Sequence, residues 1–260
     1  SRLSPHISFG TLSVREVEQA VAERRAQLGP QDQMFKRSLS SFSSRLVWRC
    51  HFMQKLEDQP DLDRVCMHRG FEGLREPFHN SEFLQAWCQG QTGYPFVDAC
   101  MRSLNQTGWL NFRMRAMLVS FAAYHLWLDW RQFGPHLARQ FTDYEPGIHY
   151  SQLQMQSGVT GINTLRIYNP VKQSYDQDPE GKFIRKWVPE LADISLQWLH
   201  EPWKINHHVA SPLGKHYPCP LVINETAMKQ ARARMTEARD VDGFADIARQ
   251  VYARLGSRNR

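Results

Sequence analysis

The sequence predicts an all-α protein, and three observations point to that class. Apolar residues recur every three or four positions through much of the 260-residue chain, which is the spacing of helices that bury one face. No stretch shows the every-second-residue alternation of a strand over a convincing length. No segment repeats, so the helices are expected to form one domain rather than a repeat array.

The first part of the chain predicts four helices and one long connection. Residues 14–28 carry apolar side chains among charges, and Ser13 is a candidate N-cap. Residues 40–56 predict a second helix that begins in a serine-rich stretch. Residues 57–77 are polar with scattered Gly and Pro, which predicts an irregular connection. Two short helices are then expected, over 81–89 and 94–104.

The longest apolar run predicts a long buried helix over 107–128. Ser120, Tyr124 and His125 interrupt this run, so it is too short and too polar for a membrane span. The Gly134-Pro135 pair is expected to break the helical pattern, with a short helix after it over 135–141.

From residue 142 to 178 the helical period is lost, and glycines and prolines punctuate the chain. This predicts a long irregular central loop, and long ordered loops are usually functional. Helical spacing returns around Glu190, Trp198 and residues 226–235.

Charge and cysteine usage narrow the class of protein. Lys+Arg 32 against Asp+Glu 26 gives a formal charge of +6, which favours a polyanion such as nucleic acid but also fits an ordinary solvated surface. The five cysteines are scattered and never spaced as CxxC, and the histidines lack the spacing of metal ligands, so no metal is expected. Reduced thiols and the lack of a signal segment predict a cytoplasmic protein.

Four sequence blocks occur together in an informative order. They are SRLSP at 1–5, the block from QTGYPFVDA at 91–99 to RMR at 113–115, RIYNP at 166–170, and GKFIRKWVPEL at 181–191. Together they resemble the flavin-binding helical domain of the photolyase/cryptochrome family. The resemblance implies a single helical FAD-binding domain over 1–260. Family members usually carry an upstream α/β antenna domain, and none is expected in this chain.

The resemblance also implies which residues contact FAD. The proposed cofactor positions are Ser1, Arg2, Leu3, Ser4, Arg49, Trp109, Arg115, Asp143, Glu145 and His149. The first four match a loop that holds the pyrophosphate, although the tetrapeptide alone also fits a capped helix start. Asp143 and Glu145 match an Asp-x-Asp pair, although a solvated acidic loop fits them too. His149 falls near the flavin N5, where family members often carry Asn, and an imidazole there could tune or deliver a proton.

Further positions are implied for catalysis and DNA contact. Trp48 would face the substrate pocket, or it is an ordinary core tryptophan. Trp130 matches the middle tryptophan of a three-residue electron relay whose other two positions fall on non-aromatic residues, so the usual relay is not expected to operate. Trp87, Trp109 and Trp127 are alternative relays. Arg113 and Arg166 match positions beside the DNA backbone, where cations bind phosphates without reading sequence.

Departures from the family concentrate in the lesion-binding half of the pocket. Arg45 stands where repair enzymes place a glutamate, and Phe112 and Ala116 replace an asparagine and a methionine. Leu153 and Met155 take the positions of an aromatic pair. The flavin half of the site is therefore expected to be kept, and the lesion half rebuilt.

These features support one leading function and two alternatives. The leading hypothesis is a photolyase-like lyase, in which photoexcited reduced FAD splits pyrimidine photoproducts in single- or double-stranded DNA. A cryptochrome-type photoreceptor would bind FAD and a protein partner without repair. A basic helical module that binds nucleic acid without flavin is the third reading.

Overall fold

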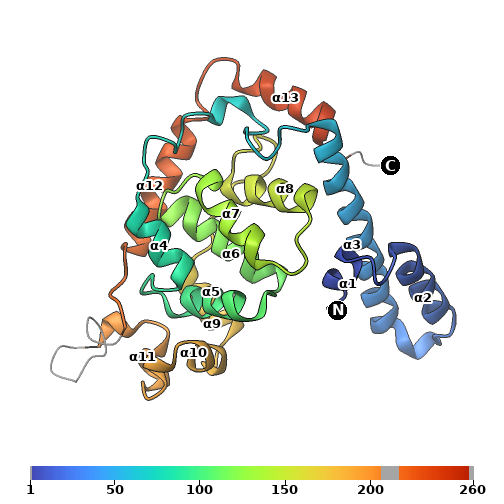
Figure 1. Cartoon of the computed structure of the whole chain (residues 1–260), viewed down its shortest axis with the longest axis horizontal. Coiled ribbons are helices and arrows are strands. Elements are labelled where there is room, and N and C mark those ends of the chain that lie inside the picture. Colours follow the sequence, from blue (N-terminus) through green and yellow to red (C-terminus); the bar gives the residue numbers. More distant parts are fainter. Residues whose placement is uncertain (1, 206–216, 258–260) are drawn as a thin grey trace.

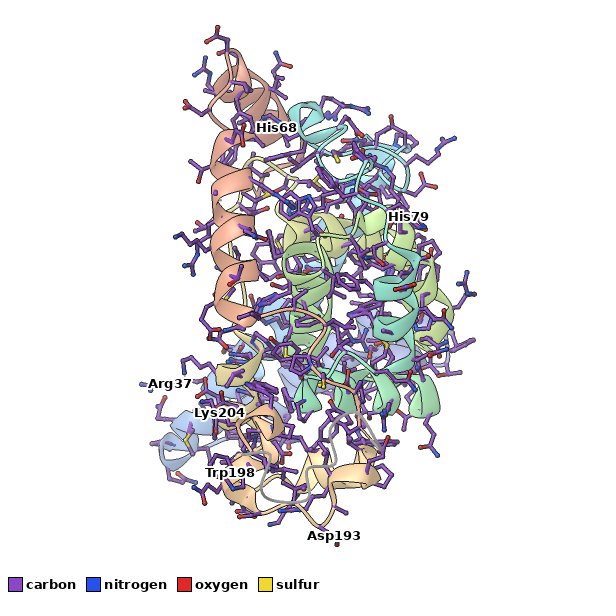
Figure 2. The ribbon with its side chains drawn as sticks, turned by 90° about the vertical axis from the view of Figure 1, so that its left-hand side faces the viewer. Arg37, His68, His79, Asp193, Trp198 and Lys204 are labelled. Atoms are coloured by element: carbon purple, nitrogen blue, oxygen red, sulfur yellow. The ribbon has the colours of Figure 1, made fainter. Side chains whose placement is uncertain are left out.

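The computed structural model describes residues 2–205 and 217–257, and throughout these ranges the chain forms helices and no strand. The predicted all-α class is confirmed. Helices α5 to α8 form the centre of the molecule, α3 runs along one flank, and α12 and α13 lie on the other sides (Figure 1). In the view of Figure 2, the end that carries Asp193 and Trp198 lies opposite the end that carries His68.

The N-terminal helices are α1 (Ser4–Ser8), α2 (Val14–Ala26) and α3 (Gln33–Asp58). The predicted cap of α2 is confirmed: the Glu16 amide donates to Ser13 Oγ at 3.1 Å, and the Ser13 amide donates to Glu16 Oε2 at 2.7 Å. This reciprocal arrangement satisfies two amides that the helix cannot bond internally. Helix α3 begins earlier than predicted, after the short η1 turn (Pro30–Asp32).

The next two helices agree closely with prediction. They are α4 (Ser81–Gln89) and α5 (Pro95–Thr107), which follow an irregular connection that contains only the short η2 turn (Arg69–Phe71). Asn80 caps α4 by accepting from the Phe83 amide at 3.0 Å. Residue Gly90, with φ 65°, ends α4 in the left-handed conformation that glycine adopts without steric cost.

The prediction of one helix over 107–128 is wrong at both ends, because Thr107 is the last residue of α5 and the helical stretch that follows, α6 and then η3, covers only 112–125. Gly108 ends α5 with φ 68°, and Asn111 starts α6 (Phe112–Ser120) by accepting from the Met114 amide at 3.1 Å. The π-helix η3 (Phe121–His125) continues α6, and the chain leaves it through Trp127 with φ 52°. Capping at Gly108 and Asn111 therefore overrides the continuous apolar pattern.

The predicted break at Gly134-Pro135 is also wrong, because α7 (Trp130–Gln140) runs through both residues. Asp129 caps the helix by accepting from the Arg131 amide at 2.9 Å. A buried stripe that includes Trp130 and Phe133 holds it to the core. This burial outweighs the cost of an internal proline, which is about 3 kcal/mol.

The central segment is less irregular than predicted, since it contains α8 (Pro146–Ser157) and α9 (Pro170–Gln177). Both helices place proline at their first position, where its missing N–H costs nothing. Glu145 and Asn169 cap them, and Gly158 ends α8 with φ 75°. The irregular parts are the turn at 142–145 and the residues between the two helices.

The C-terminal part supplies short helices and two longer ones. These are α10 (Lys182–Trp187), η4 (Pro189–Leu191), α11 (Leu196–Leu199), η5 (Pro202–Lys204), α12 (Asn224–Glu237) and α13 (Phe244–Leu255). The predicted helical segments near Glu190, Trp198 and 226–235 are confirmed. In the part of the chain that the structure describes, no helix combines the length and apolarity needed to cross a membrane.

Helix α3 packs closely against α8 at Gly147. A Cβ atom added at Gly147 would lie 2.7 Å from Met53 Cα and 3.0 Å from the Phe52 carbonyl oxygen. Only glycine permits this approach of the two backbones. The contact fixes α8 relative to the α3 residues Trp48 and Arg49, one turn earlier.

Candidate cofactor-binding site

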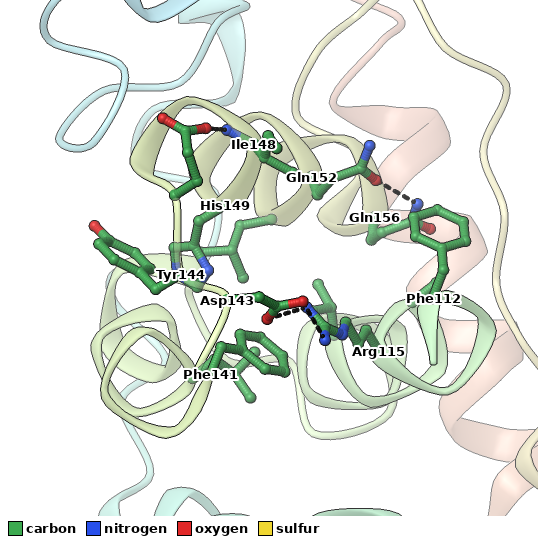
Figure 3. A pocket seen from close by; sticks show the side chains of 14 residues that line it. Phe112, Arg115, Phe141, Asp143, Tyr144, Ile148, His149, Gln152 and Gln156 are labelled. Atoms are coloured by element: carbon green, nitrogen blue, oxygen red, sulfur yellow. Dashed lines mark hydrogen bonds and ion pairs between the residues drawn. The ribbon is translucent and has the colours of Figure 1, made fainter. Parts of the chain in front are cut away.

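A cavity lies between helices α6, α7 and α8 (Figure 3). Its cavity volume is about 100 Å³, it is partly open to solvent, and its exposed wall is mainly apolar. The lining residues are Phe112, Arg115, Ala116, Val119, Leu137, Phe141, Asp143, Tyr144, Glu145, Ile148, His149, Gln152, Leu153 and Gln156. An apolar cavity with a few converging polar groups is the usual form of a small-molecule site.

Arg115 and Asp143 form a two-pronged ion pair at one side of the cavity. Arg115 Nη1 and Nη2 donate to Asp143 Oδ1 and Oδ2, each at 2.9 Å, and Arg115 Nε donates to the Leu110 carbonyl oxygen. The guanidinium carbon lies 4.1 Å from the centre of the Phe141 ring. The Asp143 side chain is only 5% exposed, so the pair presents a rigid charged edge within an apolar wall.

Glu145 begins α8 as its N-cap. Its Oε2 accepts a hydrogen bond from the Ile148 amide at 2.8 Å. The side chain is half-buried at the cavity, so it is not part of a freely solvated loop. One carboxylate oxygen is thus used to hold the helix, and the other is free of any hydrogen bond among the described residues.

His149 lines the cavity as a neutral hydrogen-bonding ring. Its Nε2 lies 3.1 Å from the Gly134 carbonyl oxygen, and since a carbonyl only accepts, Nε2 carries the proton. Burial, helped by the positive charge of Arg115, lowers the pKa of His149 to about 4. The ring is therefore uncharged at neutral pH, with Nδ1 as an acceptor, and does not titrate near pH 7.

We expect His149 to make the protein less stable in mild acid. Below its ordinary pKa of 6.5 the unfolded histidine binds a proton, whereas the buried ring stays neutral until about pH 4. The free energy of unfolding therefore falls by about 2 kcal/mol per such histidine between pH 7 and pH 5. His125, whose pKa burial also lowers to about 4, contributes in the same direction.

Urea unfolding at several pH values checks this expectation. His149→Asn should reduce the slope of stability against pH by the part due to His149, leaving the part due to His125 and to the other histidines whose pKa burial lowers, His51, His136 and His200. The exposed His79, outside the cavity lining, is the site of the surface control substitution, His79→Asn. A slope that His149→Asn does not alter would show that the ring titrates normally.

The N-terminal segment contacts Trp109, which precedes α6, and Tyr144, which lines the cavity. The Arg2 guanidinium carbon lies 4.9 Å from the centre of the Trp109 ring, and Ser8 Oγ donates to the Tyr144 carbonyl oxygen at 2.8 Å. Leu3 and Ser4 lie between these two contacts. Ser1, the first residue of the expected phosphate loop, lies outside the described residues.

Trp48 and Arg49 lie on α3, outside the cavity lining. Trp48 is 40% exposed and packs on the Phe52 ring at 5.7 Å between centroids, so it is not an ordinary core tryptophan. Arg49 Nη1 donates to Met53 Sδ at 2.9 Å, at the point where α3 meets the start of α8.

Trp130 is fully buried behind the cavity. Its ring packs edge to face on the Tyr150 ring, with 6.3 Å between the ring centroids. The Tyr150 ring packs in the same manner on the His149 ring, with 5.0 Å between the centroids. The structure therefore links Trp130 to the cavity wall through one tyrosine. Leu153, at the position expected for the inner relay tryptophan, lines the cavity itself.

The two expected DNA-contacting arginines, Arg113 and Arg166, are both exposed. Arg166 lines a second, shallower groove with Lys172 and Arg232. Neither Arg113, Arg166 nor Arg232 forms an ion pair within the described residues. Their charge is thus available to an external anion.

Sequence reasoning missed three polar residues that line the cavity: Tyr144, Gln152 and Gln156. The last two follow His149 at three and seven positions, the spacing of one helix face. That signal was present, but the segment was assigned to a loop. Among residues 2–205 and 217–257, no group of three or more histidine, cysteine or acidic side chains could hold a metal ion.

Comparisons with known proteins place these features in a family context. A family model described as the FAD binding domain of DNA photolyase matches residues 42–237. The chain is 34% identical over 244 residues to the deoxyribodipyrimidine photo-lyase of Streptomyces griseus, and 34% identical over 245 residues to that of Escherichia coli. These alignments cover 93% and 92% of this chain but 49% and 50% of the relatives. The chain thus spans about half the length of the curated relatives it matches.

Solved structures show the same likeness. The fold matches a class III photolyase from Agrobacterium tumefaciens with a TM-score of 0.81 and 29% identity, over 92% of this chain and 50% of that one. It matches a Synechocystis cryptochrome with a TM-score of 0.80 and 27% identity, over 89% of this chain and 48% of that one.

Proposed function

The chain belongs to the family of FAD-binding domains of DNA photolyase, and on this premise we propose that the cavity binds FAD and that the protein is a light-dependent, photolyase-like lyase acting on pyrimidine photoproducts in DNA. The observation that carries the proposal is the fixed Arg115–Asp143 ion pair inside an otherwise apolar cavity. Such a site offers apolar walls to a flavin ring and charged hydrogen-bonding groups to its polar edge.

The residues present fit FAD on both counts. Phe141, Leu137 and Leu153 supply an apolar wall, while Arg115, Asp143 and His149 supply donors and acceptors on the same cavity. Arg2 packs on Trp109, and Ser8 of the same N-terminal segment bonds the cavity residue Tyr144, so the guanidinium of Arg2 and the hydroxyl of Ser4 are the groups of this segment that suit a pyrophosphate. Arg49 and Glu145, where α3 meets α8, complete the proposed set.

Bound FAD would supply the light-driven electron transfer, and the chain's residues would position and shield it. Because the Arg115 guanidinium is hydrogen-bonded to Asp143 and to the Leu110 carbonyl oxygen, it is held in one orientation before any ligand binds. His149 keeps its proton on Nε2 and presents Nδ1 as an acceptor. We propose Trp130, through Tyr150, as the redox-active side chain behind the site, since it is the expected relay residue that contacts this wall.

We propose DNA as the partner, held by Arg113, Arg166 and the neighbouring Arg232, with Trp48 exposed beside the site to stack on a base.

Arg166→Gln and Arg232→Gln should each weaken binding to undamaged DNA and lower the slope of log affinity against log salt by about 0.9, the value for one phosphate contact. Fluorescence anisotropy at several salt concentrations measures both quantities. Arg15→Gln, on the peripheral helix α2, is the matched control. Equal slopes for all three variants would contradict the assignment.

A repair assay tests the proposed reaction. FAD-loaded protein is mixed with an oligonucleotide that carries one thymine dimer, single- or double-stranded, and kept in blue light with a thiol reductant or in the dark. We expect intact thymines to return only in the light. FAD binding without repair of either substrate would contradict the lyase and favour a cryptochrome-type receptor, which the changes at Arg45, Phe112 and Ala116 would then explain.

A further inference from the structure

Two glutamines stand side by side at the cavity, one helical turn apart on α8. Gln156 Nε2 donates to Gln152 Oε1 at 3.3 Å, and both residues line the cavity (Figure 3). Gln156 is only 6% exposed. The other amide atoms of the pair, Gln152 Nε2 and Gln156 Oε1, have no hydrogen-bonding partner within the described residues.

We propose that Gln152 and Gln156 are specificity-determining residues that hydrogen-bond the base edge of a damaged pyrimidine. This inference rests on the proposed function and names the groups that recognise its substrate. The bases of a thymine or uracil photoproduct present carbonyl oxygens beside an N–H group, a pattern of acceptors and a donor. Amide side chains match such edges, as asparagine and glutamine do when they read bases.

The chemistry of the pair does not depend on the orientation of either amide. One hydrogen bond between two carboxamides uses one N–H and one oxygen, whichever residue donates. One free NH₂ group and one free carbonyl therefore remain side by side. The pair always offers a donor and an acceptor together, which is what a pyrimidine edge requires.

Burial makes binding to the glutamine pair selective. A polar group that leaves water without regaining a hydrogen bond loses free energy, so the pair favours a ligand with a complementary polar edge over an apolar one. Phe112, 58% exposed, lines the same cavity and offers a ring face against which a base can stack (Figure 3). A stacking ring next to an amide pair is the arrangement that holds an extruded base.

The pair also answers a question that the sequence raises. Arg45 and Phe112 occupy positions where repair enzymes of the family were expected to carry a glutamate and an asparagine. The first change replaces an acceptor with donors, and the second removes an amide. Gln152 and Gln156 supply amide groups to the cavity that Phe112 lines, from helix α8 instead of α6.

Binding in the dark tests the proposal without interference from repair. Fluorescence anisotropy of the FAD-loaded protein gives the Kd for an oligonucleotide with a thymine dimer and for the undamaged oligonucleotide. We expect Gln152→Leu and Gln156→Leu each to lower the ratio of these affinities by about 3- to 10-fold, the value of one net hydrogen bond. Affinity for undamaged DNA should stay the same. Gln85→Leu, on the exposed side of α4, is the matched control and should leave the ratio unchanged.

The outcomes separate this inference from the proposed function. If the wild-type protein does not distinguish damaged from undamaged DNA, the proposed function fails and this inference fails with it. If the wild type distinguishes them and both leucine variants do so equally well, the glutamine pair alone is overturned. Circular dichroism and flavin content establish that each variant is folded and loaded. Gln152 is the more exposed of the two. If the Gln156→Leu variant does not fold, Gln152→Leu alone therefore tests the inference.

Discussion

Arg115→Leu is expected to abolish FAD binding, with a loss of at least about 100-fold in affinity. The substitution removes the guanidinium that Asp143 accepts from twice and leaves a carboxylate that is 5% exposed without its partner. Breaking a buried ion pair from one side costs about 3–5 kcal/mol, and part of this cost is expected as lost stability. Flavin fluorescence during titration measures the affinity, and circular dichroism measures the helical fold.

A second ion pair provides the control for this prediction. Arg102 Nη1 donates to both carboxylate oxygens of Glu190, at 2.9 and 2.8 Å, outside the cavity lining. Arg102→Leu should therefore reduce stability while leaving FAD affinity within about twofold. Equal loss of FAD affinity in both variants would show that the effect of Arg115 is only structural.

Asp98→Ala is expected to cost about 4 kcal/mol of stability, the largest stability effect of any single change considered. The buried carboxylate accepts from the Thr92 amide at 2.8 Å, from Thr92 Oγ1 at 2.7 Å and from the Gly93 amide at 3.1 Å, and the Tyr217 hydroxyl is a fourth donor. Alanine would leave all four donors unsatisfied in the core, at about 1–3 kcal/mol each before relaxation. Urea unfolding measures the loss.

Two further substitutions serve as comparisons for Asp98→Ala: asparagine at the same position and alanine at a surface aspartate. Asp98→Asn should rescue only part of the loss, because its amide NH₂ would face a backbone N–H, that of Thr92 or that of Gly93. Asp193→Ala, at the exposed end of the molecule, should change stability by no more than about 0.5 kcal/mol (Figure 2). A small loss at Asp98 would contradict the assignment of its carboxylate as the anchor of this turn.

The role of Asp98 explains what the most informative sequence block does. The stretch at 91–99 belongs to the blocks that carry the family resemblance, yet it is absent from the cavity lining: residues 92–99 are buried in the turn before α5 and in the start of α5 itself. Gly93, with φ 80°, lies so close to Cys219 that a Cβ would come within 2.4 Å of its carbonyl. The block thus encodes a tight junction of distant segments, which supports the site without lining it.

Helix existence followed from the sequence wherever apolar spacing was strong, as in α2, α4 and α5. It failed where Gly and Pro were read only as breakers. Pro146 and Pro170 are first-turn residues, and Gly158 is a C-terminal cap, so each marks a helix boundary rather than a loop. The internal Pro135 was equally misleading, because burial of the α7 face outweighs its cost.

The candidate site was predictable in part. Arg115, Asp143, Glu145 and His149 line one cavity, as their assignment to one cofactor requires. The pairing of Arg115 with Asp143 joins residues 28 apart, and no local pattern predicts such a contact. The low pKa of His149 likewise follows from burial beside Arg115, which only the packed structure reveals.

The visible absorption spectrum of the purified protein after incubation with FAD and gel filtration tests the central claim most directly. We expect flavin bands that elute with the protein at about one FAD per chain, as one cavity of this kind implies. Protein that elutes colourless, with a normal helical circular dichroism spectrum and all added FAD in the small-molecule fraction, would contradict the assignment of the cavity between α6, α7 and α8 as a flavin site.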